Sequence, residues 1–199
     1  MKKFELTNEF VTNMFGTKLF RIRALVEFGD VEAGELGGYV EKESNLGHDD
    51  NAWVYDNAWV YGNARVYGDA LVYDNARVYD NAWVYGDAQV SGDARVYGNA
   101  RVYGNAWVYG NALVCSDEDY AYAHGFGSVN RTTTFFRLKD GGVGVRCGCF
   151  YGTLAQFRDK IRETHGETKK AQEYLMLADL MELRFEEDEN EVGNRKYVE

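Results

Sequence analysis

One pattern of hydrophobic and polar residues repeats every six positions through the middle of the chain. A Val stands at every sixth position from Val54 to Val114 without an insertion, and an Ala stands four positions after each Val from Ala58 to Ala112. The two positions before each Ala are drawn from Gly, Asp and Asn, which accept tight turns and left-handed backbone. Each hexad therefore predicts a short strand followed by a corner.

A period of six fits neither the two-residue period of a single strand nor the 3.6-residue period of a helix. A coil of short strands satisfies it, with Val inside, the small Ala beside each corner, and successive turns stacked at the strand spacing of ~4.8 Å. The spacing resembles that of the hexapeptide-repeat proteins, whose fold is a triangular left-handed parallel β-helix with three hexads per turn. The resemblance, and not the spacing, implies the left hand. We therefore expect a mainly β protein whose residues 52–115 form somewhat more than three turns of such a coil.

The ends of a coil expose strand edges, which other chains could pair with, so the flanking segments are expected to cover them. Residues 4–10 and 17–28 alternate as two strands of a hairpin joined around residues 13–16, and a Gly-rich passage leads from there into the repeat. Residues 1–51 are therefore predicted to be an N-terminal β-hairpin cap with an irregular first turn.

Residues 116–185 predict a C-terminal α+β unit made of a hairpin and two helices. The segment from Thr132 to Phe150 alternates about a Lys-Asp-Gly-Gly turn, which is typical of a hairpin. Thr153 with Gln156 three residues later predicts a capping box that opens a helix, and Gly166 ends it. The last segment, 186–199, is rich in acids and is predicted to be a flexible tail.

The second helix is expected from about Glu167 to Phe185. Its predicted apolar stripe includes Ala171, Tyr174, Leu175, Ala178, Met181 and Phe185.

Composition narrows the class of protein. The chain has 199 residues, of which 45% are hydrophobic and 27% charged, as in ordinary soluble globular proteins. It has neither an apolar run of ~18 residues nor a secretory signal, and an odd number of cysteines suits a reducing compartment. We expect no membrane contact and a location in the cytoplasm. The net charge of −10 disfavours non-specific nucleic-acid binding, which needs a basic surface.

Stacking by three hexads sorts the outward residues into three faces. On one face, Gln89 and Ser91 interrupt a column of large residues and predict a notch that could take a planar or peptide ligand. Stacked Tyr columns could instead only stabilise the coil. So much exposed Trp and Tyr also suits a surface that meets a partner or a sister subunit. The candidate partner- or ligand-binding residues are Leu71, Tyr73, Gln89, Ser91, Trp107 and Tyr109.

Arg77 and Arg95 are expected one strand apart on a second face, where their like charges repel unless an anion bridges them. They are the candidate anion-binding residues, although both side chains could also extend into solvent. The third face carries Arg65, Trp83 and Arg101, which predict a cation–π ladder with a structural role.

Catalytic chemistry has weak candidates. Many hexapeptide-repeat proteins are acyltransferases that use a His, and among His48, His124 and His165 the better-placed candidate is His124, just after the repeat. Cys147 and Cys149 are expected as two buried thiols on one strand face rather than as metal ligands. We expect no metal and no cofactor, and read the Asp residues of the corners as turn formers.

The layout as a whole resembles a family of small phage- and prophage-encoded hexapeptide-repeat proteins of unsettled function. The similarity rests on the passage GDVEAGELGGYVEKESNL, the Tyr-Gly-Asn-Ala units, and then TTTFFR, CGCF, a helix opened by GTL, and ETHG. It spans nearly the whole chain and implies a phage-related setting.

Together these observations favour a non-enzymatic binding or scaffolding protein that presents aromatic β-helix faces to a host or phage protein, for example to block a host defence component. A homo-oligomer, with a trimer as one arrangement, is expected. Two alternatives remain open: acyl transfer that depends on acyl-CoA, and sequestration of an anionic nucleotide signal.

Overall fold

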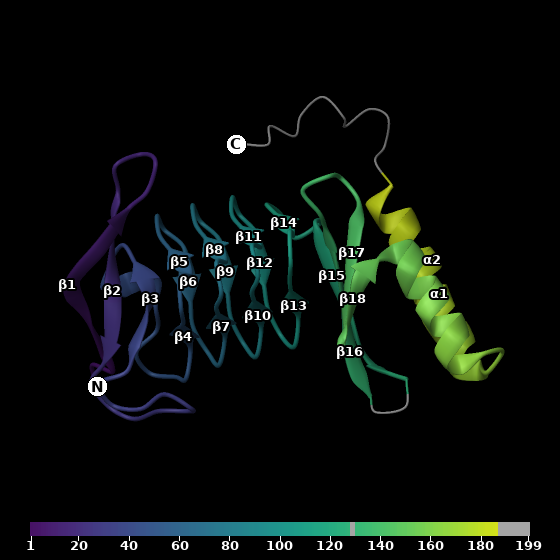
Figure 1. The fold of residues 1–199 in the computed structure, drawn as a ribbon, viewed down its shortest axis with the longest axis horizontal. Helices are drawn as coiled ribbons and strands as arrows, with labels where there is room; N and C mark the ends of the chain where they lie inside the picture. The colour runs from purple at the N-terminus through teal and green to yellow at the C-terminus, as the bar shows by residue number, and fades with distance from the viewer. Residues whose placement is uncertain (128–129, 187–199) are drawn as a thin grey trace.

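The computed structural model describes residues 1–127 and 130–186. An N-terminal group of strands, a β-solenoid, a four-stranded sheet and two helices follow one another along the long axis of the molecule (Figure 1). The mainly β architecture and the two C-terminal helices predicted from the sequence are confirmed. The predicted acidic tail, beyond Glu186, lies outside the described residues.

The solenoid is built from strands of two residues that recur every six positions. Their bounds are β4 Trp53–Val54, β5 Trp59–Val60, β6 Arg65–Val66, β7 Leu71–Val72, β8 Arg77–Val78, β9 Trp83–Val84, β10 Gln89–Val90, β11 Arg95–Val96, β12 Arg101–Val102, β13 Trp107–Val108 and β14 Leu113–Val114. Each strand pairs in parallel with the strand three hexads along, as β7 does with β10. The repeat therefore forms three parallel sheets around one core.

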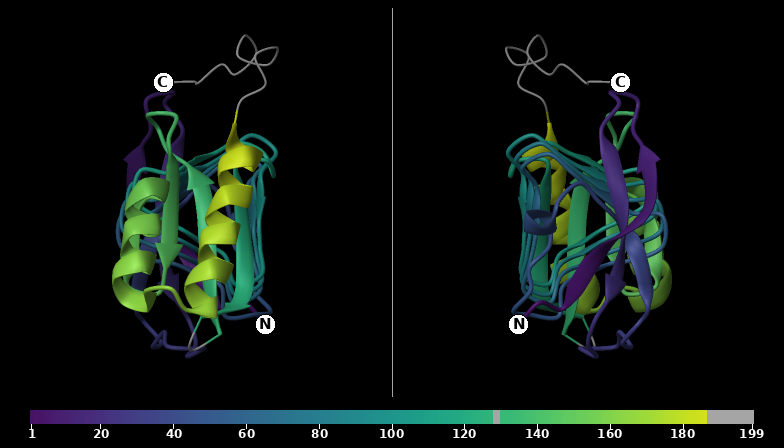
Figure 2. Two further views of the ribbon diagram at one scale, coloured as in Figure 1. Left: turned by 90° about the vertical axis from the view of Figure 1, so that its right-hand side faces the viewer. Right: turned by 90° about the vertical axis from the view of Figure 1, so that its left-hand side faces the viewer.

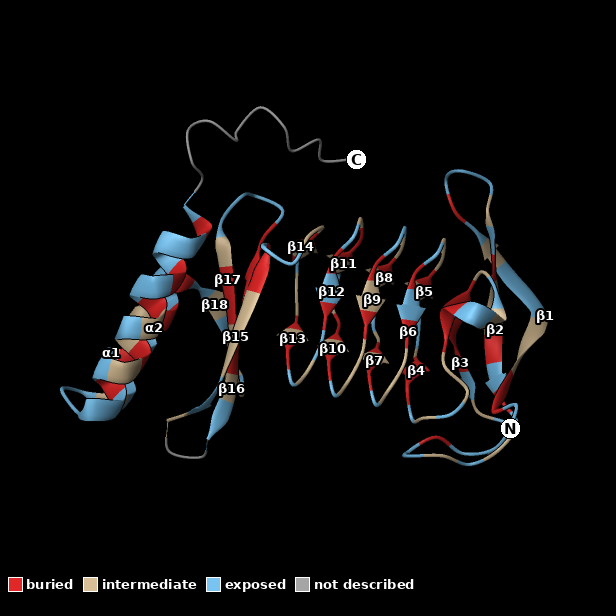
Figure 3. Cartoon of the chain, turned by 180° about the vertical axis from the view of Figure 1, so that it is seen from behind, coloured by how far each residue is buried: buried red, intermediate tan, exposed pale blue. Residues whose placement is uncertain are grey.

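The interior of the coil holds the residues that the period predicts. Every Val from Val54 to Val114 and every Ala from Ala58 to Ala112 is buried, and these side chains form one continuous core (Figure 3). Small Ala is needed at the corners because the chain turns sharply there and leaves little volume. The outer positions beside each Val are mostly half-buried.

The backbone conformation at each corner explains why only Gly or Asp stands directly after the outward aromatic position. This corner position has positive φ throughout, with Asp at residues 56, 74 and 80 and Gly elsewhere, a conformation that most side chains avoid. The Asp74 carboxylate accepts a hydrogen bond of 2.9 Å from the backbone N–H of Gly92 in the next turn. These carboxylates thus join successive turns of the solenoid.

The N-terminal strands continue one of the three sheets. β1 (Phe4–Thr12) and β2 (Lys18–Ala24) are antiparallel, and β3 (Leu36–Val40) pairs antiparallel with β2 and parallel with β5. A 3-10 turn follows at Glu43–Asn45.

This unit buries Trp53, which the alternation of the repeat places on an outer face. The Phe28 and Phe4 rings pack on the Trp53 indole at centroid distances of 5.3 and 6.2 Å, and the indole is fully buried. Trp53 is therefore not part of an exposed aromatic face, because the N-terminal segments cover the first turn.

The C-terminal sheet has the order β15 (Tyr120–Phe126), β16 (Arg131–Arg137), β17 (Val143–Cys147) and β18 (Phe150–Thr153), all antiparallel. The predicted hairpin is β16 with β17, and the sequence reasoning missed β15 and β18. Helices α1 (Leu154–His165) and α2 (Lys169–Phe185) lie side by side against this sheet (Figure 2).

Helix α1 begins where the capping residues predict, and α2 begins at Lys169, close to the expected Glu167. Thr153 accepts from the Gln156 backbone N–H and the Gln156 side chain accepts from the Thr153 N–H, so the expected capping box is present. Gly166 ends α1 with a φ of 56°. In α2 the predicted stripe is buried except for Leu175, which is half-buried.

Candidate functional site

The outer surface of the solenoid has three faces, which we number by their strands. Face 1 is β4, β7, β10 and β13; face 2 is β5, β8, β11 and β14; face 3 is β6, β9 and β12. Paired strands are in register without a shift, so each outward residue stacks on the residue three hexads along the chain, as the six-residue period predicts.

The notch predicted on face 1 is filled. Ser91 is fully buried, and the Trp107 indole N–H donates to its hydroxyl at 3.2 Å. The Tyr73 hydroxyl donates to the Gln89 carbonyl oxygen at 3.1 Å. The small residues therefore make room for the indole of the next turn and leave no opening for a ligand at Ser91.

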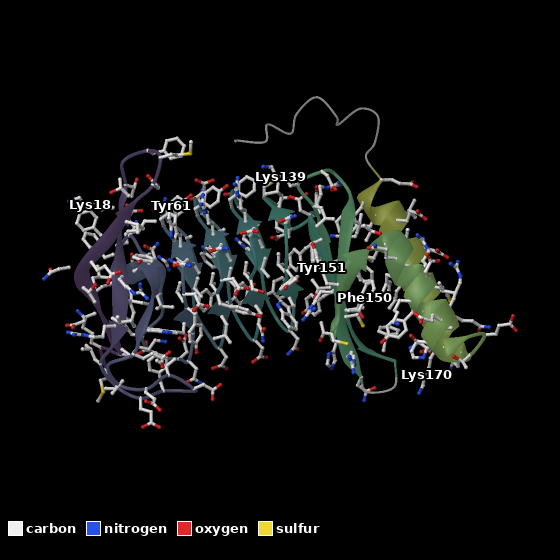
Figure 4. All side chains as sticks on the ribbon, viewed as in Figure 1. Lys18, Tyr61, Lys139, Phe150, Tyr151 and Lys170 are labelled. Atoms are coloured by element: carbon white, nitrogen blue, oxygen red, sulfur yellow. The ribbon has the colours of Figure 1, made fainter. Side chains whose placement is uncertain are left out.

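The end of face 1 is also covered by the C-terminal sheet. The Arg146 guanidinium lies 3.9 Å from the Trp107 ring centre and 4.9 Å from that of Tyr109, and the Tyr151 ring, which reaches from β18, is 4.9 Å from Tyr109 (Figure 4). With Trp53 covered at the other end, both ends of face 1 are covered by the flanking units. The sequence offers no signal for this contact, since Arg146 is far from Trp107 along the chain.

On face 2, Arg77 and Arg95 lie on neighbouring strands in register, as expected. The Arg77 guanidinium lies 4.4 Å above the Trp59 ring. Beside them the rings of Tyr61, Tyr79 and Tyr97 stack nearly parallel, at centroid distances of 5.0 and 5.2 Å. The stack forms a rigid aromatic ladder along this face.

On face 3, two arginines enclose one indole. The guanidinium groups of Arg65 and Arg101 lie 5.9 and 5.3 Å from the Trp83 ring centre, one from each neighbouring strand. The rings of Tyr67, Tyr85 and Tyr103 stack at 5.0 and 5.4 Å. The predicted cation–π ladder is therefore present, and Arg65, Arg101 and Tyr103 are exposed.

The four arginines of faces 2 and 3 differ from others in the chain. Within residues 1–127 and 130–186, no carboxylate lies within 4.0 Å of the guanidinium groups of Arg65, Arg77, Arg95 or Arg101, although the Asp117 carboxylate accepts a hydrogen bond from the Arg101 backbone N–H. By contrast, several arginines outside the solenoid are paired with carboxylates: Arg21 with Glu9, Arg23 with Glu5, Arg158 with Asp179 and Glu182, and Arg162 with Asp159. In a chain of net charge −10, faces 2 and 3 therefore carry guanidinium groups without a carboxylate neighbour among the described residues, and three of the four lie on aromatic rings.

The Tyr ladder of face 2 predicts a loss of stability in alkali. Burial, and then the neighbouring Tyr61, raises the pKa of Tyr79 from 10.0 to about 12. Between these values the folded chain binds more protons than the unfolded chain, so stability is full below pH 10.0 and falls as the pH rises toward 12. We expect the thermal midpoint to fall over this range, and to fall less in Tyr79→Phe, whose ring cannot ionise. An unchanged pH dependence in Tyr79→Phe would contradict the assignment.

The remaining candidate residues lie in the C-terminal and N-terminal units. His124 is exposed on β15, where its Nδ1 lies 2.8 Å from the Thr132 hydroxyl. His48 stacks on Phe4 at 4.4 Å, and burial lowers its pKa. Neither His124 nor His48 lines the cavity described in the next paragraph, so these two residues give the acyl-transfer hypothesis no geometric support.

A cavity of about 230 Å³ lies between the β17–β18 turn and the two helices. Its lining includes Cys147, Cys149, His165, Arg131 and Tyr174. The prediction of two buried thiols on one strand is wrong, because β17 ends at Cys147 and Cys149 lies in the exposed turn before β18. Over the described part of the chain, no three His, Cys, Asp or Glu side chains are placed to hold a metal ion.

Comparison with known families identifies the repeat. Five segments match the family described as the YdcK beta solenoid repeat, at residues 58–73, 70–86, 88–104, 94–110 and 100–116. The chain is a repeat β-helix protein. The match lies within the solenoid and does not extend over the flanking units. No curated protein matches the chain.

Among the helices of the described residues, none is long and apolar enough to cross a membrane.

Proposed function

We propose that the chain is a non-enzymatic binding or scaffolding protein whose solenoid presents arginine and aromatic side chains to an acidic surface of a protein partner. The observation that carries this proposal is the set of four arginines on faces 2 and 3 that have no carboxylate partner among the described residues. Unpaired guanidinium groups are the donors that carboxylates bind most strongly.

The residue types on these faces support the proposal. Trp, Tyr and Arg are the residues most often found at the energetic centres of protein interfaces. Here the rings of each Tyr ladder are already stacked, and three of the four arginines already lie on a ring, so binding would order few additional side chains. A lower entropic cost of ordering leaves more of the contact energy as affinity.

The overall negative charge does not oppose this contact strongly. At physiological salt, charges further apart than ~8 Å are largely screened, so a partner that docks on face 2 or 3 responds mainly to the local arginines. In the phage-related setting that the sequence resemblance implies, the partner would be a host protein, and blocking a host defence component is the role we propose. The solenoid that displays these faces would be left-handed, as in hexapeptide-repeat proteins.

The proposal predicts that one pair of arginines controls capture of a specific partner. We expect the immobilised wild-type chain to retain a defined host protein. The double variant of the face that this protein contacts should lose it. That variant is Arg77→Gln with Arg95→Gln for face 2, or Arg65→Gln with Arg101→Gln for face 3. With the purified partner, the double variant should weaken binding by at least ~30-fold, because interface arginines are often worth more than ~2 kcal/mol.

Matched controls are Arg23→Gln and Arg162→Gln, which remove exposed arginines that are paired with carboxylates outside the solenoid. They should retain the partner with unchanged affinity, and added salt should weaken wild-type binding. Capture that is the same for wild type, both face variants and the controls would overturn the proposal.

The in-register pair Arg77 and Arg95 also supports a second candidate function, sequestration of an anionic nucleotide. A thermal-shift screen with ATP, ADP-ribose and cyclic dinucleotides distinguishes the two. A shift that disappears in Arg77→Gln with Arg95→Gln would favour nucleotide sequestration, and no shift with any of these compounds would favour protein binding.

A further inference from the structure

Helix α2 has a second apolar stripe, on the side that faces away from the sheet. Met176, Leu180 and Leu183 are 71%, 54% and 67% exposed. They are spaced by four and three residues, which places them on one face of a helix. Large apolar side chains exposed together in this way mark an interaction surface more often than a free surface.

The fold of the chain does not require this stripe. The opposite face of α2 already packs on the sheet and on α1 through a different set of residues, namely Ala171, Tyr174, Ala178, Met181 and Phe185. Amphipathic patterning of the helix therefore needs only that set. Polar residues at positions 176, 180 and 183 would fold equally well, so the three exposed side chains call for another explanation.

The charged residues beside the stripe indicate what covers it. Glu173 lies along one edge near the start of the stripe, and Arg184 lies along the same edge near its end, three turns later. When two identical helices pack antiparallel, residues on equivalent edges meet, so Glu173 of each copy would lie beside Arg184 of the other. In a parallel pair related by two-fold symmetry, equivalent residues lie on opposite edges of the contact, so Glu173 and Arg184 of the two copies would not meet.

We propose that α2 forms an antiparallel contact with α2 of a second copy of this chain. The contact buries Met176, Leu180 and Leu183 from both copies and is flanked by two Glu173–Arg184 pairs related by two-fold symmetry. Among the described residues of one copy, Glu173 forms a 3.7 Å pair with the exposed Lys169, and Arg184 donates a 3.4 Å hydrogen bond to the Asp117 carbonyl oxygen. Both groups can exchange these long contacts for the intermolecular pair.

The position of α2 makes this contact compatible with the solenoid faces. The helices form the end of the molecule opposite β1 and β2, and α2 shows an outward surface there (Figure 2). Two copies joined at this end would point their solenoids away from each other and leave faces 2 and 3 free. Such a dimer would be bivalent toward an immobilised or oligomeric partner, although its formation does not depend on the proposed function.

The contact is small. Helix α2 has 17 residues, which span ~25 Å at ~1.5 Å per residue, and a single helix face buries less than the ~800 Å² per partner of a standard interface. We therefore expect a dissociation constant in the micromolar range rather than an obligate dimer.

Sedimentation velocity of the full chain over a concentration series tests the proposal. Wild type should pass from monomer to dimer across the micromolar range, and Leu180→Glu should raise the dissociation constant by at least ~30-fold, because it places a charge at the centre of the contact. Phe15→Glu is the control, since Phe15 is also a large exposed apolar residue, at 73%, but lies in the β1–β2 turn. It should dimerise as wild type does, and circular dichroism should show both variants folded.

A charge exchange tests the antiparallel arrangement. Glu173→Arg should weaken the dimer because it opposes Arg184 of the second copy, and the double variant Glu173→Arg with Arg184→Glu should restore it. A wild-type chain that stays monomeric at the highest concentration, a trimer, or a dimer unaffected by Leu180→Glu would overturn the proposal. So would dimerisation that appears only after residues 187–199 are removed, because that segment would then be the occupant of the stripe.

Discussion

Gly86→Val is expected to lower the free energy of unfolding by about 2–3 kcal/mol. Gly86 has a φ of 69°, and a left-handed backbone costs an ordinary residue roughly 1–2 kcal/mol. A Cβ at this position would also lie 3.0 Å from the backbone nitrogen of Gly104 in the next turn, which cannot move without disturbing its own strand. The branched Val side chain adds crowding at this corner. Chemical denaturation followed by far-ultraviolet circular dichroism measures the change.

Gly86→Asp is the matched control for this prediction. Asp occupies the equivalent corner position at residues 56, 74 and 80 with the same positive φ. Its carboxylate could accept the Gly104 N–H, as the Asp74 carboxylate accepts that of Gly92. We expect a loss below about 1 kcal/mol, since the added hydrogen bond offsets part of the strain. Equal losses in the Val and Asp variants would show that the features common to both, a Cβ against Gly104 and the positive φ, set the cost and that the carboxylate hydrogen bond offsets none of it.

Arg137→Met is expected to cost about 3–5 kcal/mol, the second large effect. Arg137 and Asp119 form a buried pair at 3.5 Å where the C-terminal sheet meets the end of the solenoid. Asp119 also accepts hydrogen bonds from the backbone N–H groups of Cys115 and Ser116, and Arg137 lies over the Phe185 ring. Removing the guanidinium would leave the buried carboxylate without its cation, and breaking such a pair from one side costs about 3–5 kcal/mol.

Arg162→Met serves as the control for the buried pair. Arg162 and Asp159 form an exposed pair at 3.2 Å on α1, and exposed pairs contribute at most ~1 kcal/mol. Thermal unfolding of the two variants should therefore differ clearly. A small loss in Arg137→Met would mean that the joint between the solenoid and the C-terminal unit depends on its apolar contacts rather than on this ion pair.

The predictions about the repeat were the most accurate because they depend on local chemistry. Inward Val, small corner Ala, and Gly or Asp at the left-handed position are conditions that each hexad meets by itself, and the constant period then sets the register of every strand pair. The helix boundaries were equally local, since Thr153 and Gln156 cap α1 with their own side chains.

Predictions about the outer surface were less accurate because exposure depends on segments that are distant in sequence. The alternation places Trp53 and Trp107 outside the coil, yet Phe28 covers the first and Arg146 the second. Ser91 reads as a gap between large residues, but the adjacent indole fills it. Nothing in the repeat encodes these contacts, because the covering residues belong to the flanking units.

The candidate site likewise has features that the sequence predicts and features that only the structure shows. Arg77 and Arg95 on one face, and Arg65 and Arg101 around Trp83 on another, follow from the period alone. Two facts needed three-dimensional contacts: the guanidinium groups of these arginines have no carboxylate within 4.0 Å in the described chain, and the flanking units cover both ends of face 1. Side-chain pairing depends on what the corners and terminal units place within ~4 Å, which one-dimensional spacing does not report.

By itself, the sequence determined the coiled architecture, the content of its core, the strand register, the two helices and the cap of the first, because each rests on backbone preferences and periodic burial that act over a few residues. The tertiary structure alone decided which outer face remains available and that α2 carries an uncovered apolar stripe. Both depend on how separate units pack against one another, and that packing is selected by shape and burial across the whole chain rather than by any local pattern.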